Sequence, residues 1–466
     1  MKSRVFILLF CVFSFILKSQ SVIGVDTLIK TGPVSKRINI VVMGDGYTSG
    51  QTTQYLSDAT AISNYLLATP PFSNYTNYFN VYAIKCVSTQ SGVTHPGTAT
   101  DVTEPASPVT SVTNYFGTRF DWGNIHRLMV AGNSSTVFSV LSTHFPNYDQ
   151  IIMLGNSTVY GGSGGSIAAT SLNSASKDIA VHEIGHSFAG LADEYWAGIG
   201  YAAEKPNMTA NSNSLTVKWS QWVGINSVGV YPHGASSPMN LWFKPHQSCK
   251  MQSLSFPFCS VCQQTIIERI HTLSNPIDAY YPPNATAVTF TSSSQWFKTT
   301  LVKPNPNTLK RTWDLNSVVI SNNTDSVLVN AISLIPGTNT LKVTVIDTTG
   351  LSKDVNHPSL HSYSVIWSIN NSSTGIIDVK AQMEYSIFPN PASNFINLKY
   401  NLLQSASIVI AVIDANGKTV IRKNLGKQDP SEYLHEIDVQ DLSQGNYFLS
   451  IQIDNKTYNN QFVIFK

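Results

Sequence analysis

The pattern of hydrophobic and polar positions in the first third of the chain alternates between strand-like and helix-like periods. Residues 38–43 are apolar except for Asn39, which is typical of a strand buried on both faces. Over residues 52–67 the apolar side chains recur every three or four positions, as they do on one face of a helix. Residues 80–84 and 150–154 are strand-like again. This alternation predicts an α/β layer with a mostly parallel sheet.

The pattern is strand-like throughout the later part of the chain. Short apolar runs alternate there with turn residues, and Trp313 and Trp367 are the expected core residues. We therefore predict an immunoglobulin-like β-sandwich over residues 276–371. A polar linker is expected at residues 372–384 and a small C-terminal β-sandwich at residues 385–466. The strands predicted in the first sandwich are residues 286–291, 295–302, 317–320, 326–334, 340–347 and 363–369.

Composition indicates several folded domains and excludes a nucleic-acid partner. The chain has 466 residues, which is too long for one ordinary domain, and its 42% hydrophobic content suffices for sizeable cores. Only 12% of the residues are charged, and the net charge is +2. Because there is neither a basic cluster nor a run of like charges, we expect no nucleic-acid binding and no charged interaction tail.

The N-terminus has the features of a secretory signal peptide, which we place at residues 1–21. Lys2 and Arg4 provide the positive start, and residues 5–17 are an apolar run that is too short to span a bilayer comfortably. No later stretch is long enough to cross a membrane. We therefore expect an exported protein whose mature chain carries no transmembrane segment.

The cysteines agree with export. Cys11 would leave with the signal peptide, so that four cysteines remain, at positions 86, 249, 259 and 262. An even number in an exported protein favours disulfides. Cys259 and Cys262 also have the spacing of metal ligands, so a structural metal site is the alternative. The sequence does not choose among the possible pairings.

A His-Glu-x-x-His motif at residues 182–186 is the strongest chemical signal in the chain. Positions four apart lie on one face of a helix, so His182 and His186 can offer two imidazole nitrogens to one point. Two such nitrogens are half of a tetrahedral zinc site. Glu183 lies close to the same point without being a ligand, where it can take a proton from a zinc-bound water. The motif predicts a zinc site with a glutamate general base.

A catalytic zinc needs a third protein ligand, and two carboxylates follow the motif. Gly190 can end the helix by entering the left-handed region and turning the chain sharply. Asp193 and Glu194 come next, and either carboxylate could return to the metal.

The stretch from His182 to Tyr195 resembles the signature of the immunoglobulin-A peptidase family, which are zinc metallopeptidases of metzincin type. This resemblance implies that residues 22–275 form a metzincin-like α/β catalytic domain, with the zinc helix under a mixed, mostly parallel sheet. The resemblance continues at residues 44–48, 160–165, 249–251 and 259–262.

The same resemblance implies which carboxylate binds the metal. In metzincins two residues separate a glycine from the third ligand, which selects Asp193. Glu194 stays the alternative, because one residue more than usual separates His186 from Gly190.

Two further expectations follow from the metzincin resemblance. Met251 would lie in the methionine-containing turn that gives the ligand histidines an apolar floor, with Met239 as the second choice. Residues 166–172, after the glycine-rich turn at residues 160–165, would form an edge strand that lines the cleft and pairs with substrate backbone. An ordinary hairpin is the alternative for this segment.

The C-terminal segment resembles the sorting domain of the bacterial type IX secretion system. The resemblance covers residues 385–466 and rests on Phe-Pro-Asn-Pro-Ala at residues 388–392, a hairpin turn at residues 414–418 and the stretch at residues 442–449. It implies a Gram-negative bacterium, a secreted or cell-surface location, and an interaction with the secretion machinery.

Together these features predict a secreted zinc-dependent endopeptidase that hydrolyses a protein or glycoprotein substrate. Zinc held by His182, His186 and Asp193 would activate a water molecule, with Glu183 as the general base. One alternative is a surface binding protein with a degenerate peptidase-like domain, which the intact Glu183 argues against. The other is a zinc amidase that acts on peptide cross-links or glycopeptides.

Overall fold

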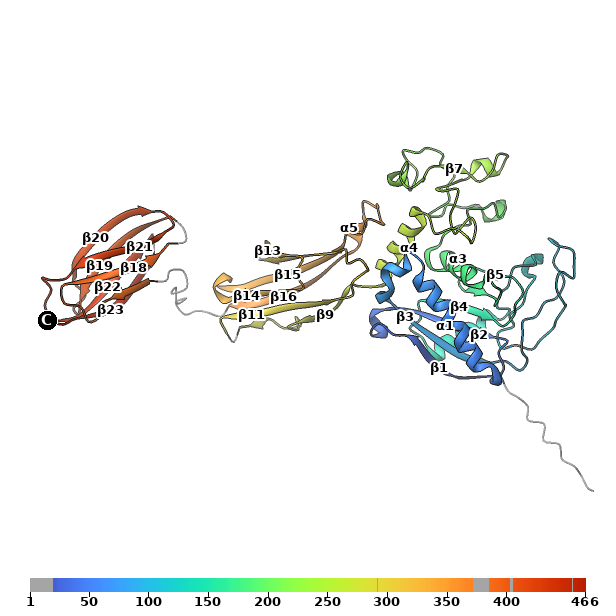
Figure 1. Cartoon of the computed structure of the whole chain (residues 1–466), viewed down its shortest axis with the longest axis horizontal. Helices are drawn as coiled ribbons and strands as arrows, with labels where there is room; N and C mark the ends of the chain where they lie inside the picture. Colours follow the sequence, from blue (N-terminus) through green and yellow to red (C-terminus); the bar gives the residue numbers. More distant parts are fainter. Residues whose placement is uncertain (1–19, 291, 372–384, 403–404, 455) are drawn as a thin grey trace, which may run out of the picture. The chain divides into compact units, whose positions relative to one another are not determined.

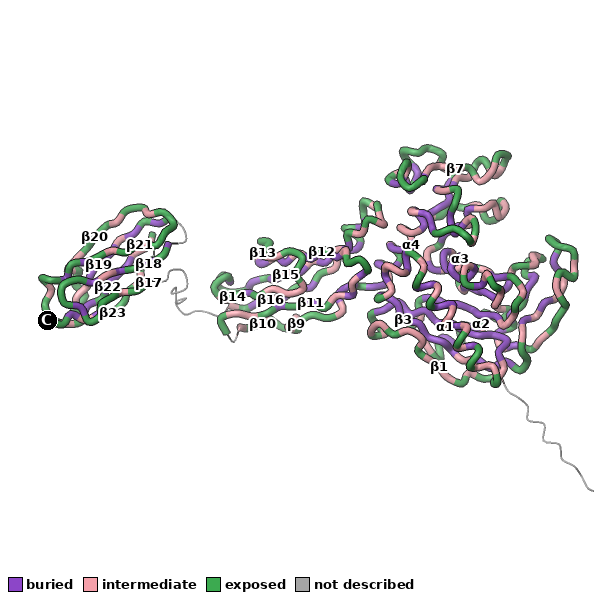
Figure 2. Tube along the Cα trace, viewed as in Figure 1, coloured by how far each residue is buried: buried purple, intermediate pink, exposed green. Residues whose placement is uncertain are grey.

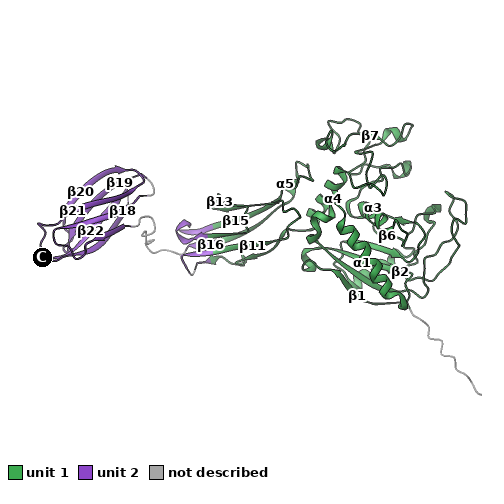
Figure 3. Ribbon diagram, viewed as in Figure 1, with its two compact units in different colours: residues 1–288, 296–328, 340–368 green, residues 289–295, 329–339, 369–466 purple. Residues whose placement is uncertain are grey.

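The computed structural model describes most of the chain, namely residues 20–290, 292–371, 385–402, 405–454 and 456–466. The expected linker at residues 372–384 lies outside the described residues, and so does all but the end of the expected signal peptide. Two compact units are distinguished in Figure 3. The first comprises residues 1–288, 296–328 and 340–368, and the second residues 289–295, 329–339 and 369–466.

A mixed six-stranded sheet organises the N-terminal part of the first unit (Figure 1). The strand order is β1-β3-β2-β4-β6-β5. Strand β2 runs parallel to β3 and β4, and β4 runs parallel to β6, whereas the edge strands β1 and β5 are antiparallel to their neighbours. The prediction of a mixed, mostly parallel sheet is confirmed. The strands are β1 (Ser21–Ile29), β2 (Ile38–Asp45), β3 (Phe79–Val87), β4 (Gln150–Gly155), β5 (Gly162–Ser163) and β6 (Ala168–Thr170).

Helices cover both faces of this sheet, so that its central strands β2 and β4 are buried along their whole length (Figure 2). Ile40 and Val42 of β2 pack with helices α1, α3 and α4 on one face. Val41 and Met43 point to the other face and pack with α2. The helices are α1 (Thr52–Ala68), α2 (Ser134–His144), α3 (Ser176–Ala189) and α4 (Ser260–Leu273), with short 3-10 turns at Val34–Lys36, Ser49–Gln51, Phe72–Tyr78 and Trp122–Asn124.

The Gly-Asp-Gly turn after β2 fastens a long loop to the sheet. Asp45 is fully buried, and its carboxylate accepts hydrogen bonds from the backbone N–H groups of Tyr115 (2.7 Å) and Thr118 (2.9 Å) and from Ser88 Oγ (3.1 Å). A buried carboxylate with several donors stabilises the chain it contacts. Asp45 therefore fixes the loop after β3 above the end of the sheet.

The segment between α3 and α4 is mostly irregular, as its Gly, Pro, Asn and Trp content leads one to expect. Trp219 and Trp222 are buried and provide much of its core. Its short elements are 3-10 turns at Ile199–Tyr201, Ser220–Trp222 and Met239–Leu241 and the paired strands β7 (Tyr231–Pro232) and β8 (Phe243–Lys244).

Two sheets follow, of five strands in the order β10-β16-β15-β12-β13 and of three in the order β14-β11-β9. Trp313 and Trp367 are fully buried, and Phe297 of the smaller sheet packs against Trp367 of the larger one. The elements are β9 (Ile277–Tyr281), β10 (Val288–Thr289), β11 (Ser294–Leu301), β12 (Leu309–Leu315), β13 (Val318–Asn322), β14 (Ser326–Asn330), a 3-10 turn (Ala331–Ser333), β15 (Gly337–Asp347), α5 (His357–Leu360) and β16 (Ser362–Asn371). Strands β9 and β12 were not predicted.

The C-terminal residues form two more sheets around a core of their own. The orders are β17-β18-β21 and β20-β19-β22-β23. The predicted hairpin turn joins β19 and β20, with Asp414 N donating to Lys418 O and Gly417 at φ 84°. None of the described helices is both long and apolar enough to cross a membrane. The strands are β17 (Tyr385–Phe388), β18 (Phe395–Asn401), β19 (Ala406–Asp414), β20 (Thr419–Gln428), β21 (Glu432–Asp438), β22 (Gly445–Ile453) and β23 (Lys456–Ile464).

Candidate active site

Helix α3 carries the His-Glu-x-x-His motif and ends where the glycine predicts. Gly190 adopts φ 66° in the left-handed region, and its N–H donates to His186 O (2.9 Å). Leu191 N donates to Gly185 O (3.1 Å), so two carbonyls at the helix end are satisfied. The chain turns there and brings the following residues back beside the helix.

Three side chains meet at this turn. The Nε2 atoms of His182 and His186 are 3.2 Å apart, and Asp193 Oδ1 lies 3.1 Å from the first and 3.3 Å from the second. Ligands placed tetrahedrally at ~2.0–2.1 Å from zinc are separated by about 3.3–3.4 Å. The donor set of two imidazoles and one carboxylate, and its spacing, therefore fit a zinc ion.

Backbone carbonyls hold both imidazoles in the tautomer that a metal requires. His182 Nδ1 donates to Lys250 O (2.9 Å), and His186 Nδ1 donates to Leu191 O (2.7 Å). Each Nε2 lone pair is then free for a metal. Burial lowers the pKa of His186, but the hydrogen bond and charge of Asp193 outweigh it and raise the pKa to about 9. The carboxylate of Asp193 thus favours a positive charge at the position between the two imidazoles.

The two neighbouring carboxylates lie on opposite sides of the chain. Asp193 faces the histidines, whereas Glu194 is fully buried and its Oε1 accepts a hydrogen bond from Asn207 Nδ2 (3.1 Å). The backbone N–H of Glu194 donates to Met251 O (2.8 Å), which holds this residue against the buried segment that contains Met251. The extra residue before Gly190 belongs to helix α3, so it leaves the spacing from Gly190 to Asp193 unchanged.

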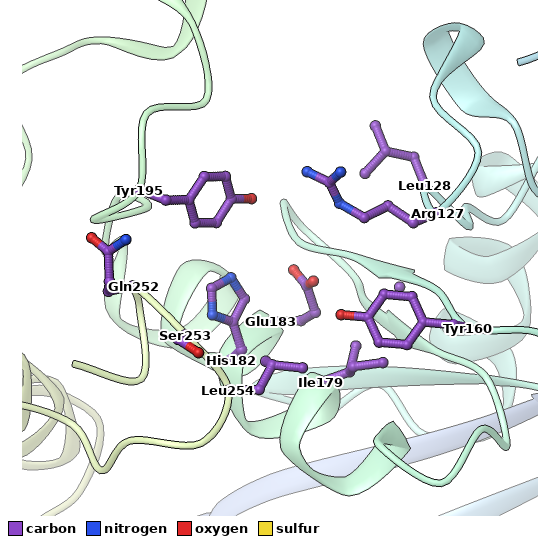
Figure 4. A pocket seen from close by; sticks show the side chains of 11 residues that line it. Arg127, Leu128, Tyr160, Ile179, His182, Glu183, Tyr195, Gln252, Ser253 and Leu254 are labelled. Carbon is purple, nitrogen blue, oxygen red and sulfur yellow. The ribbon is translucent and has the colours of Figure 1, made fainter. Parts of the chain in front are cut away.

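Glu183 projects into the cavity beside the histidines (Figure 4). Burial raises the pKa of this carboxyl, while His182 and His186 lower it in part. Gly164 leaves the space for it, because a Cβ at this position would lie 2.8 Å from His186 Cβ and 2.9 Å from Glu183 Oε2. The glycine-rich turn is thus fitted closely over the motif.

The cavity has a volume of about 410 Å³ and is lined by polar and apolar side chains (Figure 4). The Tyr195 hydroxyl and the Arg127 guanidinium both face the space above Glu183. Burial and the charge of Asp193 raise the pKa of Tyr195 to about 12 against the opposing effect of Arg127, so that the hydroxyl keeps its proton at neutral pH. The sequence did not indicate Arg127, which lies in a loop without a motif.

The expected edge strand is present as β6, but β5 lies outside it and the edge of β5 is not free. Gly162 N donates to Arg127 O (3.1 Å), and Met129 N donates to Gly162 O (3.4 Å). Residues 127–129 thus cover the edge next to the cavity. The expectation that this segment offers an open strand edge to substrate is wrong, because residues 127–129 already occupy the edge. No sequence motif marks those residues.

Met251 lies directly against helix α3. It is fully buried, and a Cβ on Gly185 would lie 2.7 Å from its Sδ atom. Its carbonyl accepts a hydrogen bond from Glu194 N (2.8 Å). Met239, the second choice, packs instead against Gly234.

Comparison with protein families agrees with both resemblances. Residues 27–228 match the family described as IgA Peptidase M64, and residues 386–465 match the secretion system C-terminal sorting domain. Both predicted family assignments are therefore confirmed. The N-terminal part of the chain is thus similar to a family of peptidases, and its C-terminal part is similar to a sorting domain of a secretion system.

No curated protein matches the chain in sequence. Solved structures align over parts of it. Dimeric latent PorU from Porphyromonas gingivalis has 13% identity and a TM-score of 0.17, and the alignment covers 40% of this chain and 20% of that one. The β-glucuronidase of Faecalibacterium prausnitzii has 12% identity and a TM-score of 0.18, with coverage of 40% and 36%. The chain thus spans well under half of the length of either structure.

Proposed function

We propose, starting from the match of residues 27–228 to IgA Peptidase M64, that this protein is a secreted zinc-dependent endopeptidase. The observation that carries the proposal is the triangle of His182, His186 and Asp193, with edges of 3.1 to 3.3 Å, directly beside Glu183. A zinc ion held there would supply a Lewis acid that acidifies water and polarises the carbonyl of a peptide bond.

Glu183 would act as the base and then as the acid. Its carboxylate takes a proton from the attacking water and delivers that proton to the nitrogen of the leaving amine. The raised pKa suits both steps, because a group with a pKa nearer to neutrality both accepts and releases a proton readily. Gly164 leaves room for this carboxylate, because a Cβ at that position would lie 2.9 Å from Glu183 Oε2.

Tyr195 and Arg127 would stabilise the negative charge that develops on the carbonyl oxygen. Both donors face the cavity, and the raised pKa of Tyr195 keeps its hydroxyl protonated. Donors aimed at a developing oxyanion are worth most when they are fixed in advance.

A second candidate function is favoured by the covered edge of β5. An extended polypeptide cannot pair with Gly162 unless residues 127–129 move, since both main-chain groups of Gly162 are already bonded. A zinc amidase acting on peptide cross-links or glycopeptides would not need that edge. Cleavage of linear peptides would support the endopeptidase, and cleavage of only cross-linked or glycosylated peptides would support the amidase.

The chemistry is tested by separating the base from the ligands. Glu183→Ala should retain zinc and lose ~10²–10⁴-fold of turnover, because the residue is a base and not a ligand. Asp193→Ala should weaken zinc binding, because two histidines alone lack the third anchor. Glu204→Ala, which removes an exposed carboxylate paired with Lys218, is the control and should change neither property. Unchanged cleavage by Glu183→Ala, or unchanged zinc affinity of Asp193→Ala, would refute the proposed roles.

A further inference from the structure

Outside the active site, three other groups of side chains in the described part of the chain have ligand atoms spaced for a metal. The first is His95, Glu104, Asp121 and His126, in the loop between β3 and α2. The second combines three cysteines with Glu194. A third group, around Glu268, makes ordinary hydrogen bonds of 2.7 and 2.9 Å and needs no ion to explain it.

In the loop group four atoms approach one another evenly. His95 Nε2 lies 3.3 Å from His126 Nδ1 and 3.4 Å from Asp121 Oδ1. His126 Nδ1 lies 3.5 Å from the same Asp121 oxygen and 3.6 Å from Glu104 Oε1. These separations are nearly those of the active-site triangle. They match the roughly 3.3–3.4 Å expected between ligands around one zinc ion.

The two carboxylate oxygens in this group have no hydrogen-bond partner. Glu104 Oε1 and Asp121 Oδ1 are buried and accept no hydrogen bond, whereas Asp121 Oδ2 accepts from Thr98 N (2.8 Å) and Glu104 Oε2 from Ala106 N (3.0 Å). Asp121 has a fully buried side chain. Burying a carboxylate oxygen that accepts no hydrogen bond costs free energy, and a bound cation would offset this cost for both oxygens.

We propose that His95, Glu104, Asp121 and His126 bind a divalent metal ion, for which zinc is the best fit. Two imidazole nitrogens and two carboxylate oxygens are ligands that zinc takes, and four protein ligands close the site. A closed site is structural and not catalytic. The ion would cross-link a loop that has little regular structure of its own. Arg127, which follows the proposed ligand His126, faces the active-site cavity.

Zinc content of the full-length protein tests this site. His126→Ala and Glu104→Gln should each lose about one zinc per chain relative to the parent and lower its melting temperature. His144→Ala, an exposed histidine at the end of α2, is the matched control and should keep the parental zinc content. Unchanged zinc content in both site variants overturns the proposal.

If the variants fail to fold, the unaltered protein still decides the matter. Crystals grown with zinc and measured across the zinc absorption edge should show an anomalous peak between His95 and His126. Absence of that peak, with the active-site peak present, overturns the proposal.

The second group is carried by a different observation, its sulfur geometry. Cys249 Sγ lies 3.7 Å from Cys262 Sγ, and Glu194 Oε1 lies 3.2 Å from Cys262 Sγ and 3.8 Å from Cys259 Sγ. All four residues are buried, and Glu194 Oε2 has no hydrogen-bond partner. Thiolates at ~2.3 Å from a tetrahedral zinc are about 3.7–3.8 Å apart. The three cysteines are free, contrary to the expectation of disulfides, since none of them is within bonding distance of another.

We infer that Cys249, Cys259, Cys262 and Glu194 bind a second structural zinc. The site would tie the residue after Asp193 to the segment that contains Met251. Lys250 in that segment supplies the carbonyl that orients His182, so the ion would brace the active site from behind.

Thiol counting separates this site from a disulfide. Denatured, unreduced parent protein should alkylate at all four cysteines of the mature chain and release a zinc ion that Cys262→Ser lacks. Cys86→Ser, which removes a buried cysteine outside the group, is the control and should keep that zinc. A disulfide between any two of Cys249, Cys259 and Cys262, or equal zinc in parent and Cys262→Ser, overturns the inference.

Discussion

Gly164 shows how narrowly the carboxylate of Glu183, the proposed general base, is confined. A methyl group at this position would meet His186 and Glu183 at under 3.0 Å, so one of them would have to shift. Misplacement by about 1 Å can cost a catalyst ~10²-fold. We expect Gly164→Ala to lower peptide cleavage by roughly that factor while the fold persists. Gly200→Ala, where no atom lies within 4 Å, is the control, and equal activity of both variants would contradict the fit.

Tyr195 offers a prediction with a kinetic readout. Its pKa of about 12 lies above the ordinary value, so the hydroxyl stays protonated and able to donate at every pH at which the protein is assayed. Tyr195→Phe should lower kcat by ~10²–10³-fold, the usual cost of one oxyanion donor, without changing zinc content. The control is Tyr201→Phe, because Tyr201 is exposed. A KM effect alone would instead assign Tyr195 to substrate binding.

Residues whose function depends on local spacing could be predicted from the sequence. His182, Glu183, His186 and Gly190 lie within three turns of chain, and their mutual positions follow from helix geometry. Arg127 could not be predicted, because hydrogen bonds to Gly162, far along the chain, place it at the cavity.

Asp347, the last residue of β15, links this strand to helix α4 through buried contacts. Its carboxylate accepts hydrogen bonds from Tyr75 (2.6 Å) and pairs with His271 (2.9 Å). Burial raises the pKa of Asp347, but the bonds from His271, Thr308 and Tyr75 outweigh it and lower the pKa below its usual range. A carboxyl whose pKa is lower in the folded than in the unfolded state stabilises the fold at pH values above its unfolded pKa. This stabilisation is lost as the pH falls through its folded pKa.

The parent should therefore lose stability as the pH falls below about 4, and Asp347→Asn should show a smaller loss over that range. The substitution should also lower the free energy of unfolding at pH 7 by about 1–3 kcal/mol. Denaturant unfolding of the first unit from pH 3 to 7 measures both effects. Asp314→Asn on β12 is the control, and an identical pH slope in parent and Asp347→Asn would contradict the linkage.

Strands in which apolar and polar residues alternate regularly were predicted from the sequence, whereas β12 was not. Leu309, Trp313 and Leu315 face inward, but the buried position between them is Arg311. Its guanidinium pairs with Asp325 (3.2 Å), so an ionic contact fills a place where the pattern requires an apolar side chain. The two-residue strand β5 is too short for any periodicity to reveal.

For the whole molecule, the separate core of the C-terminal sheets predicts independent folding. Deletion of residues 385–466 should leave the first unit folded and stop export, because that core shares no residue with the cores of the catalytic part. Circular dichroism of the purified protein and its amount outside the cell measure the two effects. Full-length Glu183→Ala, inactive but with an intact C-terminus, is the control. Normal export of the truncated chain would contradict the sorting role.

Metal stoichiometry tests the molecule as a whole. The sequence predicted one zinc, whereas the three sites proposed from the structure predict about three per chain. Brief chelation should remove the active-site zinc and all activity first, since that site opens into a cavity and the cysteine group is buried. Restored zinc should restore cleavage. Simultaneous release of every ion would contradict closed structural sites.

The opposed side chains of Asp193 and Glu194 have a consequence for how this protein can vary. Connections between secondary-structure elements ordinarily tolerate insertions and deletions. In the two proposed metal sites this dipeptide supplies one carboxylate to each, so a single residue gained or lost after Gly190 would displace both carboxylates and spoil both sites in one step. Relatives that keep both sites should therefore differ freely in the length of the later loops, but keep the distance from this glycine to the acidic pair constant.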